Sequence, residues 1–173
     1  MSTVWAICGA GRGLGKTHLA QRLCAVLPGA VYVKCGHGRA QPGKPSAFVT
    51  TEQELEAFLA GNAPSHDHVI IESNAFALTG RAQVVIYLEG TPAGAERRED
   101  ADLLRALADV VLGDRAGEAH WRQRLEARLG SGPALPAVLD VLQAQGRYLE
   151  CREWAGDAPA EVGWGRNDEE ESP

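Results

Sequence analysis

Ala10-Gly11-Arg12-Gly13-Leu14-Gly15-Lys16-Thr17 is the stretch that decides the fold of this 173-residue chain. It fits the Walker A pattern, in which Gly or Ala is followed by four residues and then by Gly-Lys-Ser/Thr. A short apolar, β-prone segment precedes it at residues 3–8, and leucines at helical spacing follow it up to residue 27. Strand, glycine-rich loop and helix in this order are the context that the motif requires. The stretch therefore predicts a phosphate-binding loop (P-loop).

The residue types of the P-loop suit an anionic ligand. Glycines let successive backbone N–H groups turn inward as an anion-binding nest, and the helix that begins at Gly15 adds the positive end of its dipole. We expect Lys16 to reach the β- and γ-phosphates and the Thr17 hydroxyl to bind Mg²⁺. Ala10 stands where glycine is usual, so its φ is expected to stay negative. The alternative is a glycine-rich turn with a solvated lysine. The residues expected to bind the nucleotide here are Ala10, Gly11, Arg12, Gly13, Leu14, Gly15, Lys16, Thr17 and His18.

Length, charge and cysteine usage limit the class of protein. At 173 residues the chain fits one domain with a substantial core, and its net charge of -6 argues against a general nucleic-acid or membrane-surface binder. No apolar run approaches membrane-spanning length, and no signal peptide is recognisable. The four cysteines lack paired spacing and fit reduced thiols, so we expect a cytoplasmic location.

Strand-like and helix-like segments alternate along the chain, which predicts βαβ units and a parallel sheet. We therefore expect a three-layer α/β/α P-loop NTPase with a mostly parallel sheet over residues 1–150. Residues 151–173 are expected to form a C-terminal extension with an acidic, disordered tail. Strands are predicted at residues 3–8, 30–35, 47–50, 68–74, 83–88 and 109–113, and helices at residues 15–27, 51–61, 96–107, 118–129 and 135–145.

Chemically active residues follow the predicted strands, where ligands of parallel sheets bind. Glu72 ends an apolar β-run, the context of a Walker B acid that holds Mg²⁺ or positions the attacking water. Lys34 is a candidate for contact with a γ-phosphate or an anionic substrate. For both residues the alternative is a solvated side chain at a strand end. Lys16 and Glu72 are thus the predicted catalytic residues, and Thr17 and Glu72 the predicted metal ligands. Cys35 and His37 could also meet a metal, but two ligands alone do not define a site.

The order of these features resembles the MobB-type proteins of molybdopterin-guanine dinucleotide biosynthesis, in the dethiobiotin-synthetase-like group of P-loop NTPases. The resemblance covers residues 3–114. It is carried by the P-loop, by the strand that ends in Lys34 before a His-containing loop, by Gly43-Lys44 with Ser46, and by Val69-Ile70-Ile71-Glu72-Ser73-Asn74. It implies GTP binding with Mg²⁺, slow hydrolysis and a homodimer that assists a cofactor-maturation enzyme. Carried over by position, Lys34 and His37 join the P-loop and Glu72 in the functional set.

Three functions are open at this point. The first is a Mg²⁺-dependent, GTPase-like NTPase with an accessory role in molybdenum cofactor biosynthesis. The second is a small-molecule or nucleotide kinase, for which Arg97 and Arg98 are the candidate arginine lid unless they are paired surface charges. The third is a nucleotide-gated protein-binding module with negligible turnover. The chain has no Asn-Lys-x-Asp motif for guanine, and Asp114 is only a positional candidate for base contacts, so the residues alone leave GTP and ATP open.

Overall fold

A single six-stranded sheet forms the centre of the computed structural model, which describes residues 2–36, 47–90, 97–114, 118–130 and 132–154. The strand order is β3-β2-β4-β1-β5-β6, and every neighbouring pair is parallel. The predicted mostly parallel sheet is therefore confirmed. The strands are β1 (Thr3–Gly9), β2 (Ala30–Cys35), β3 (Ala47–Val49), β4 (His68–Glu72), β5 (Val84–Leu88) and β6 (Val110–Leu112).

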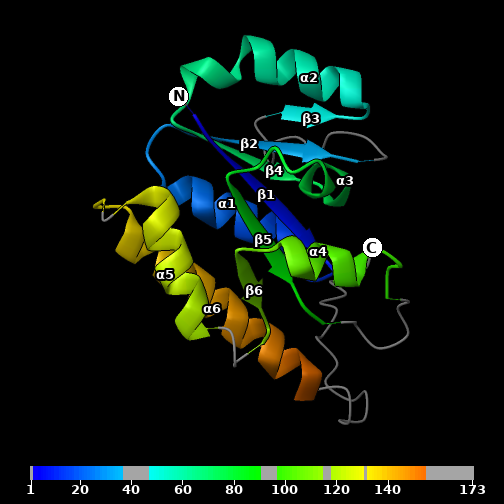
Figure 1. Ribbon diagram of the computed structural model, residues 1–173, viewed down its shortest axis with the longest axis vertical. Coiled ribbons are helices and arrows are strands. Elements are labelled where there is room, and N and C mark those ends of the chain that lie inside the picture. The colour runs from blue at the N-terminus through cyan, green and yellow to red at the C-terminus, as the bar shows by residue number, and fades with distance from the viewer. Residues whose placement is uncertain (1, 37–46, 91–96, 115–117, 131, 155–173) are drawn as a thin grey trace, which may run out of the picture.

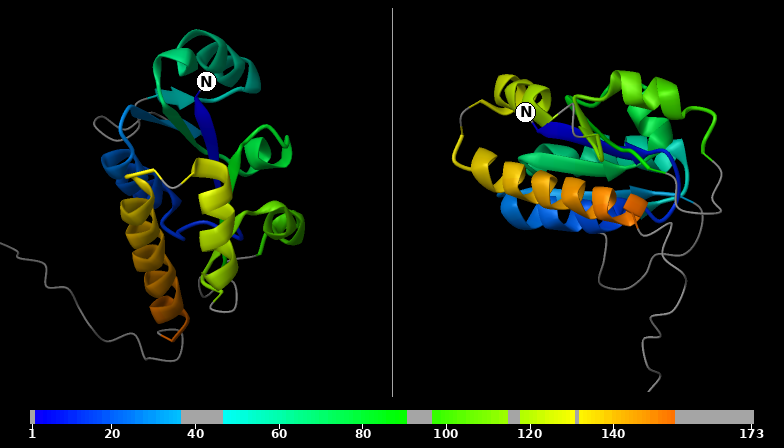
Figure 2. Two further views of the ribbon diagram at one scale, coloured as in Figure 1. Left: turned by 60° about the vertical axis from the view of Figure 1, so that its left-hand side comes forward. Right: turned by 90° about the horizontal axis from the view of Figure 1, so that it is seen from below.

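Helices cover both faces of the sheet (Figures 1 and 2), which confirms the three-layer α/β/α architecture. α1 and α6 pack side by side over one face, and α3 and α4 lie on the other. α2 lies against β3 at one edge and α5 against β6 at the opposite edge. The helices are α1 (Lys16–Val26), α2 (Glu52–Gly61), the short 3₁₀ helix η1 (Ala63–Ser65), α3 (Asn74–Leu78), α4 (Ala101–Leu107), α5 (Glu118–Leu129) and α6 (Leu135–Trp154).

The central strands are buried from both sides. Val69, Ile70 and Ile71 of β4 have no exposed surface, and all five residues of β5 are buried. Helices above and below remove the polar face that an exposed strand would have, so apolar residues run continuously instead of alternating. β1, which leads into the P-loop, pairs with β4 on one side and with β5 on the other. These two strands therefore fix the start of the loop.

The sheet register places chemical groups from separate strands at one level. Glu72 pairs with Ile7 of β1 on one side and with Lys34 of β2 on the other. Since neighbouring parallel strands end at the same edge, the carboxyl ends of β1, β2 and β4 converge beside the P-loop. In the part of the chain that the structure describes, no helix has the length and apolar character that a membrane span needs.

Three predicted boundaries are wrong. The strand predicted at residues 68–74 ends at Glu72, because the Ser73 hydroxyl accepts from the Phe76 N–H and starts the unpredicted helix α3. The helix predicted from residue 96 begins at Ala101, since the Arg98 N–H bonds to the carbonyl of Ala10 instead of a helical acceptor. α6 continues past residue 145 to Trp154, because the single Gly146 weakens a helix by only about 1 kcal/mol and does not end it. The predicted domain boundary at residue 150 thus falls inside a helix.

The capping box that Thr51 and Glu54 predict for α2 is confirmed. The Thr51 hydroxyl accepts from the Glu54 N–H at 3.1 Å, and the Glu54 carboxylate accepts from the Thr51 N–H at 3.2 Å. Such a reciprocal pair satisfies two backbone donors that a helix start would otherwise leave unpaired. It fixes the start of α2 at the carboxyl end of the sheet.

Candidate functional site

The predicted P-loop, residues 10–17, connects the end of β1 to α1 and includes the first residues of that helix. Gly13 and Gly15 have φ of 73° and 86°, the left-handed region that L side chains disfavour. No residue other than glycine has positive φ in the described part of the chain, so the expected negative φ at Ala10 is confirmed. A Cβ added at Gly15 would also lie only 2.8 Å from Nε2 of Gln145. Conformation therefore favours glycine at this position, and a side chain there would also displace the flexible end of Gln145.

Three other elements and Arg98, which precedes α4, hold the P-loop in place. The Asn74 amide of α3 accepts from the Gly9 N–H at 3.2 Å and donates to the Gly9 carbonyl at 3.0 Å. Ala10 donates to the Leu88 carbonyl of β5 at 3.1 Å and accepts from the Arg98 N–H at 3.0 Å. On the α6 side, Gln145 donates to the Leu14 carbonyl at 3.1 Å. These bonds give a preorganised loop.

The N-terminus of α1 has the features of an anion site. Its N-cap, Gly15, offers no side chain, and no acidic residue lies in the first turn, so no carboxylate competes for the free N–H groups. Lys16 folds back over the loop, with Nζ donating to the Gly11 carbonyl at 2.5 Å. Burial lowers the pKa of Lys16 below its usual value, while Glu72 partly opposes the shift. An anion at this position would stabilise both the ammonium and the helix end.

Beside the helix start, Thr17, Glu72 and Lys34 form a hydrogen-bonded cluster. The Thr17 hydroxyl donates to Oε2 of Glu72 at 2.8 Å. Lys34 Nζ donates to Thr17 Oγ1 at 3.0 Å and lies 3.4 Å from Oε1 of Glu72. Glu72 is only 8% exposed, which rules out the alternative of a solvated carboxylate at the strand end. The structure thus brings together three of the residues predicted for this site.

Tyr32 is a fourth member of the cluster that sequence reasoning missed. Its buried hydroxyl donates to Oε2 of Glu72, the same oxygen that Thr17 contacts. Burial and the neighbouring carboxylate raise the pKa of Tyr32 well above its usual value, so it remains a donor. The available signal was strand periodicity, since Tyr32 and Lys34 lie two residues apart on β2 and share a face.

The donor set of Thr17 and Glu72 fits a magnesium ion. Hydroxyl and carboxylate oxygens are hard ligands, and Mg²⁺ in nucleotide sites takes one or two protein oxygens plus waters and phosphate oxygens. The Lys34 ammonium already lies against both groups, which shows that their oxygens accommodate a cation. No group of three or more His, Cys, Asp or Glu side chains with metal-binding geometry occurs among the described residues. A metal here would therefore depend on phosphate oxygens for most of its shell.

The remaining predicted residues have varied surroundings. Gly11 and Leu14 are buried in the loop, whereas Arg12 and His18 are exposed. His37 lies outside the described residues, so its predicted role is not addressed. Burial raises the pKa of the Cys35 thiol to about 11, so without a bound metal the thiol is protonated at neutral pH.

Arg97 and Arg98 are paired as surface charges. Arg97 contacts Asp102 at 2.8 Å and Glu89 at 3.7 Å, and Arg98 contacts Asp100 at 3.0 Å. Both arginine side chains are substantially exposed. Arg98 nevertheless lies near enough to Lys16 for its charge to lower the pKa of that lysine.

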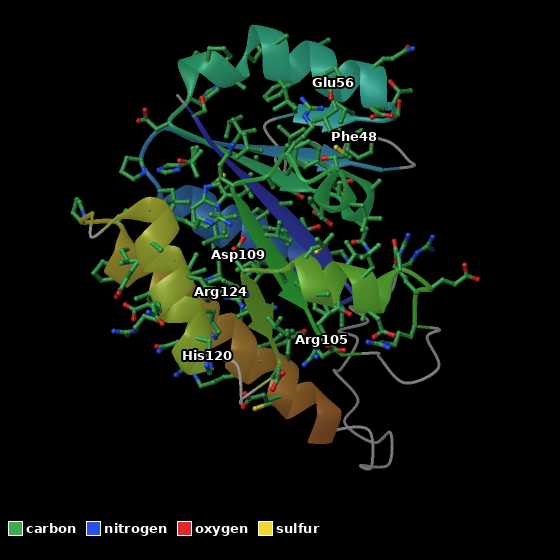
Figure 3. All side chains as sticks on the ribbon, in the orientation of Figure 1. Phe48, Glu56, Arg105, Asp109, His120 and Arg124 are labelled. Atoms are coloured by element: carbon green, nitrogen blue, oxygen red, sulfur yellow. The ribbon has the colours of Figure 1, made fainter. Side chains whose placement is uncertain are left out.

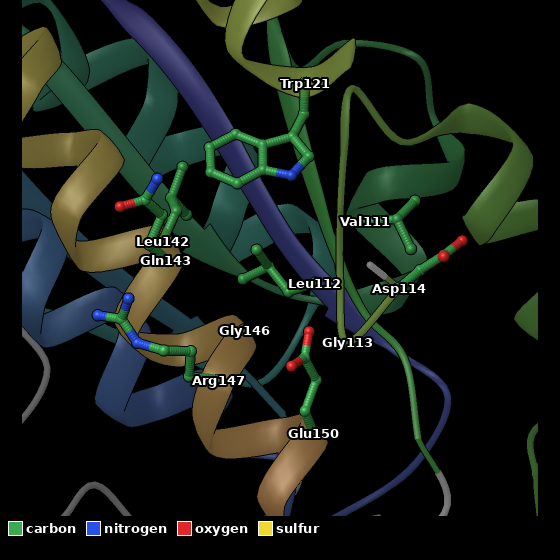
Figure 4. Close-up of a pocket in the computed structure, with 10 residues that line it drawn as sticks. All are labelled: Val111, Leu112, Gly113, Asp114, Trp121, Leu142, Gln143, Gly146, Arg147 and Glu150. Atoms are coloured by element: carbon green, nitrogen blue, oxygen red, sulfur yellow. The ribbon is translucent and has the colours of Figure 1, made fainter. Parts of the chain in front are cut away.

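Two cavities lie near the carboxyl edge of the sheet. The larger, about 410 Å³, lies between α2 and α3, and Asn74 and Arg98 form its wall on the P-loop side. The smaller, about 240 Å³, lies between β6, α5 and α6 (Figure 4). In this view the Glu150 carboxylate points toward Gly113, whereas the Asp114 carboxylate points away from the cavity. Asp114 bonds to Arg105 at 2.5 Å.

The two edges of the sheet differ from the P-loop region in the residues that they carry. Phe48 and Glu56 lie at the β3 edge, whereas His120 and Arg124 of α5 lie at the β6 edge (Figure 3). Arg124 donates to the Ala108 carbonyl at 3.0 Å, which ties α5 to the start of β6.

No protein-family model matches the chain, and a comparison with curated proteins found no match.

Proposed function

We propose that this chain is a Mg²⁺-dependent P-loop nucleoside triphosphatase. The observation that carries the proposal is the pairing of the Thr17 hydroxyl with the buried Glu72 carboxylate at 2.8 Å, directly beside the uncapped N-terminus of α1. A triphosphate on the loop would meet backbone N–H groups and Lys16 on one side. Its metal would meet Thr17 and Glu72 on the other side. The two halves of such a site are otherwise unrelated segments of the chain, 55 residues apart.

In the proposed reaction, the oxygen of water bonds to the γ-phosphorus, and the bond from that phosphorus to the β–γ bridging oxygen breaks. The proton that the water loses passes to a phosphate oxygen or to solvent. The products are a nucleoside diphosphate and inorganic phosphate. The loop N–H groups and Lys16 stabilise the charge that develops on the β- and γ-oxygens. Thr17 and Glu72 would hold Mg²⁺, which when bound neutralises charge on those same oxygens.

The surroundings of Glu72 support a positioning role. Tyr32, Thr17 and Lys34 all direct donors or positive charge at its two oxygens. These contacts hold the carboxylate in one orientation, which suits it to orienting a water molecule and a metal. We therefore propose that Glu72 positions the attacking water and the metal.

The resemblance to MobB-type proteins supports GTP over ATP and an accessory role in molybdenum cofactor maturation in the cytoplasm. A cofactor-maturation enzyme would be the partner, and a homodimer the assembly. The test is phosphate release from GTP and ATP with Mg²⁺, measured with the wild-type chain and with Lys16→Ala. The proposal is supported if the wild type releases phosphate and Lys16→Ala does not. Tight nucleotide binding without release would instead favour a nucleotide-gated protein-binding module.

The larger cavity favours a second candidate, a small-molecule kinase. Its wall includes Asn74, which hydrogen-bonds to Gly9, and Arg98, whose backbone bonds to Ala10. A metabolite bound there would lie next to the P-loop, where it could accept the γ-phosphoryl group in place of water. Label from a γ-³²P nucleotide would then appear in a metabolite and not in inorganic phosphate. A screen of metabolite pools for that transfer separates this candidate from the hydrolase.

A further inference from the structure

We propose that Lys34 acts as a resident cation at the magnesium position and makes divalent-metal binding conditional on a triphosphate. In the nucleotide-free protein its ammonium would stand in for the metal between Thr17 and Glu72. A bound triphosphate would draw the ammonium to its terminal oxygens and free both side chains for Mg²⁺. The inference rests on the proposed function, because it concerns the metal that accompanies the nucleotide.

The position of the Lys34 ammonium is the first argument. Nζ lies 3.0 Å from Thr17 Oγ1 and 3.4 Å from Glu72 Oε1, so it contacts both side chains that would hold the metal. The hydroxyl and the carboxylate also contact each other, at 2.8 Å. A divalent ion that used the same oxygens would lie within a few ångströms of the ammonium. Like charges at that distance repel strongly in a partly buried site.

The second argument is that the Lys34 backbone is fixed while its side chain can move. Lys34 pairs with Glu72 on one side and Phe48 on the other, so its main chain lies within the sheet. Its side chain is 35% exposed and has four flexible bonds. The ammonium can therefore leave the cluster without any change in the sheet.

The third argument concerns the other lysine of the site. Lys16 donates to the Gly11 carbonyl, so the ammonium groups of both lysines rest on oxygen atoms of the protein itself. A triphosphate gives Lys16 a charged acceptor in place of a neutral carbonyl, and it gives Lys34 several anionic oxygens in place of the Thr17 hydroxyl and the single Glu72 carboxylate. A diphosphate lacks the γ-phosphate, so the Lys34 ammonium would stay against the Glu72 carboxylate. Lys34 would thus make the metal site sensitive to the γ-phosphate.

The experiment measures Mn²⁺ binding to the nucleotide-free full-length chain, using the electron paramagnetic resonance signal of free Mn²⁺ as the probe. We expect weak binding to the wild type and at least about tenfold tighter binding to Lys34→Met, because the competing charge is removed. Lys34→Arg keeps the charge and Tyr32→Phe keeps the ammonium, so both should bind Mn²⁺ as weakly as the wild type. A gain of affinity in Lys34→Met that neither Lys34→Arg nor Tyr32→Phe shares would come from the missing charge.

A second measurement compares nucleoside triphosphate with diphosphate in the presence of Mg²⁺. The wild type should prefer the triphosphate, and Lys34→Met should lose about tenfold of that preference. Equal Mn²⁺ affinity in the wild type and Lys34→Met would overturn the inference, even if nucleotides bind normally. Tighter Mn²⁺ binding to Lys34→Met in a protein that binds no nucleotide would overturn the proposed function, and with it the link to the triphosphate.

Discussion

Two acids flank the P-loop, one on each side of β1, and they have different surroundings. Glu72 ends β4 and is held by hydroxyl donors from Thr17 and Tyr32 and by the Lys34 ammonium. Glu89 follows β5 and is paired with guanidinium groups, Arg105 at 2.9 Å and Arg97 at 3.7 Å. Glu72 is nearly enclosed, whereas the Glu89 side chain is 24% exposed.

The difference shows that a strand-end carboxylate acquires its role from its neighbours. Glu72 shares its oxygens with a hydroxyl from the first turn of α1, which is a geometry that a hard metal ion can use. Glu89 is neutralised by exposed arginines, and ion pairs of that kind contribute little to stability. The proposed chemistry therefore lies on the β4 side of the P-loop, whereas the β5 and β6 side has the ion pairs of a supporting structure.

The largest expected effect comes from replacing one of the two acids, Glu72 or Glu89, with glutamine. Glu72→Gln should lower Mg²⁺-dependent hydrolysis about 100-fold, because it removes the group that positions water and metal. Glu89→Gln should change the same rate less than about twofold, since its arginine partners are exposed. Steady-state phosphate release measures both. Equal losses in the two variants would remove the contrast between the two sides.

The support from α6 can be tested at Gln145, which is almost fully buried and bonds to the Leu14 carbonyl. Gln145→Leu should lower the free energy of unfolding by about 2 kcal/mol, because a buried carbonyl loses its donor. Gln143→Leu, two positions earlier on the same helix, makes the same chemical change at a side chain that is only partly buried. It is the matched control and should have a smaller effect, because water can reach the groups around it. Urea unfolding followed by circular dichroism gives both values. An unchanged midpoint for Gln145→Leu would mean that α6 does not support the loop.

A somewhat smaller effect is expected from Gly15→Ala. The residue has φ of 86°, which costs an L side chain roughly 1–2 kcal/mol, and the new methyl group would press on the flexible end of Gln145. Gly36→Ala is the control, since a Cβ there has open space. The difference between the two urea midpoints reports the cost of the P-loop conformation. Similar midpoints would contradict the assigned backbone geometry.

The smallest effect concerns pH and lies at the amino end of β4, away from the site. The pKa of His68 is lowered, mainly by burial, and its Nδ1 accepts from the Trp5 indole N–H at 3.4 Å. The unfolded chain therefore binds the proton more readily, and stability should fall as pH drops below about 6.5. His68→Gln should show a smaller loss between pH 7.5 and 5.5. If the stability of the wild type and of His68→Gln falls equally with pH, titratable groups other than His68 cause the loss.

Local patterns and the parallel register together account for which residues meet on the β4 side of the candidate site. Each signal is local in the sequence and spans only a few residues: the P-loop motif, the apolar run before Glu72, and the end of β2 at Lys34. The parallel register then brings the three segments together. Tyr32 was missed because a tyrosine in an apolar strand looks like a core residue until its hydroxyl partner is known. The contact between Gln145 and Leu14 joins residues 131 positions apart, and no local pattern encodes such a pairing. The predicted start of α4 was wrong for a similar reason, since the Arg98 N–H donates to the Ala10 carbonyl of the P-loop.

The most direct test of the central claim is calorimetric titration of the wild-type chain and Lys16→Ala with GTP and ATP, each with and without Mg²⁺. The account predicts that the wild type binds a triphosphate more tightly when Mg²⁺ is present. It also predicts that Lys16→Ala weakens that binding by at least about tenfold, because a charged hydrogen-bond donor to the phosphates is lost. Unchanged affinity in Lys16→Ala, or no binding of either nucleotide to the wild type, would contradict the account.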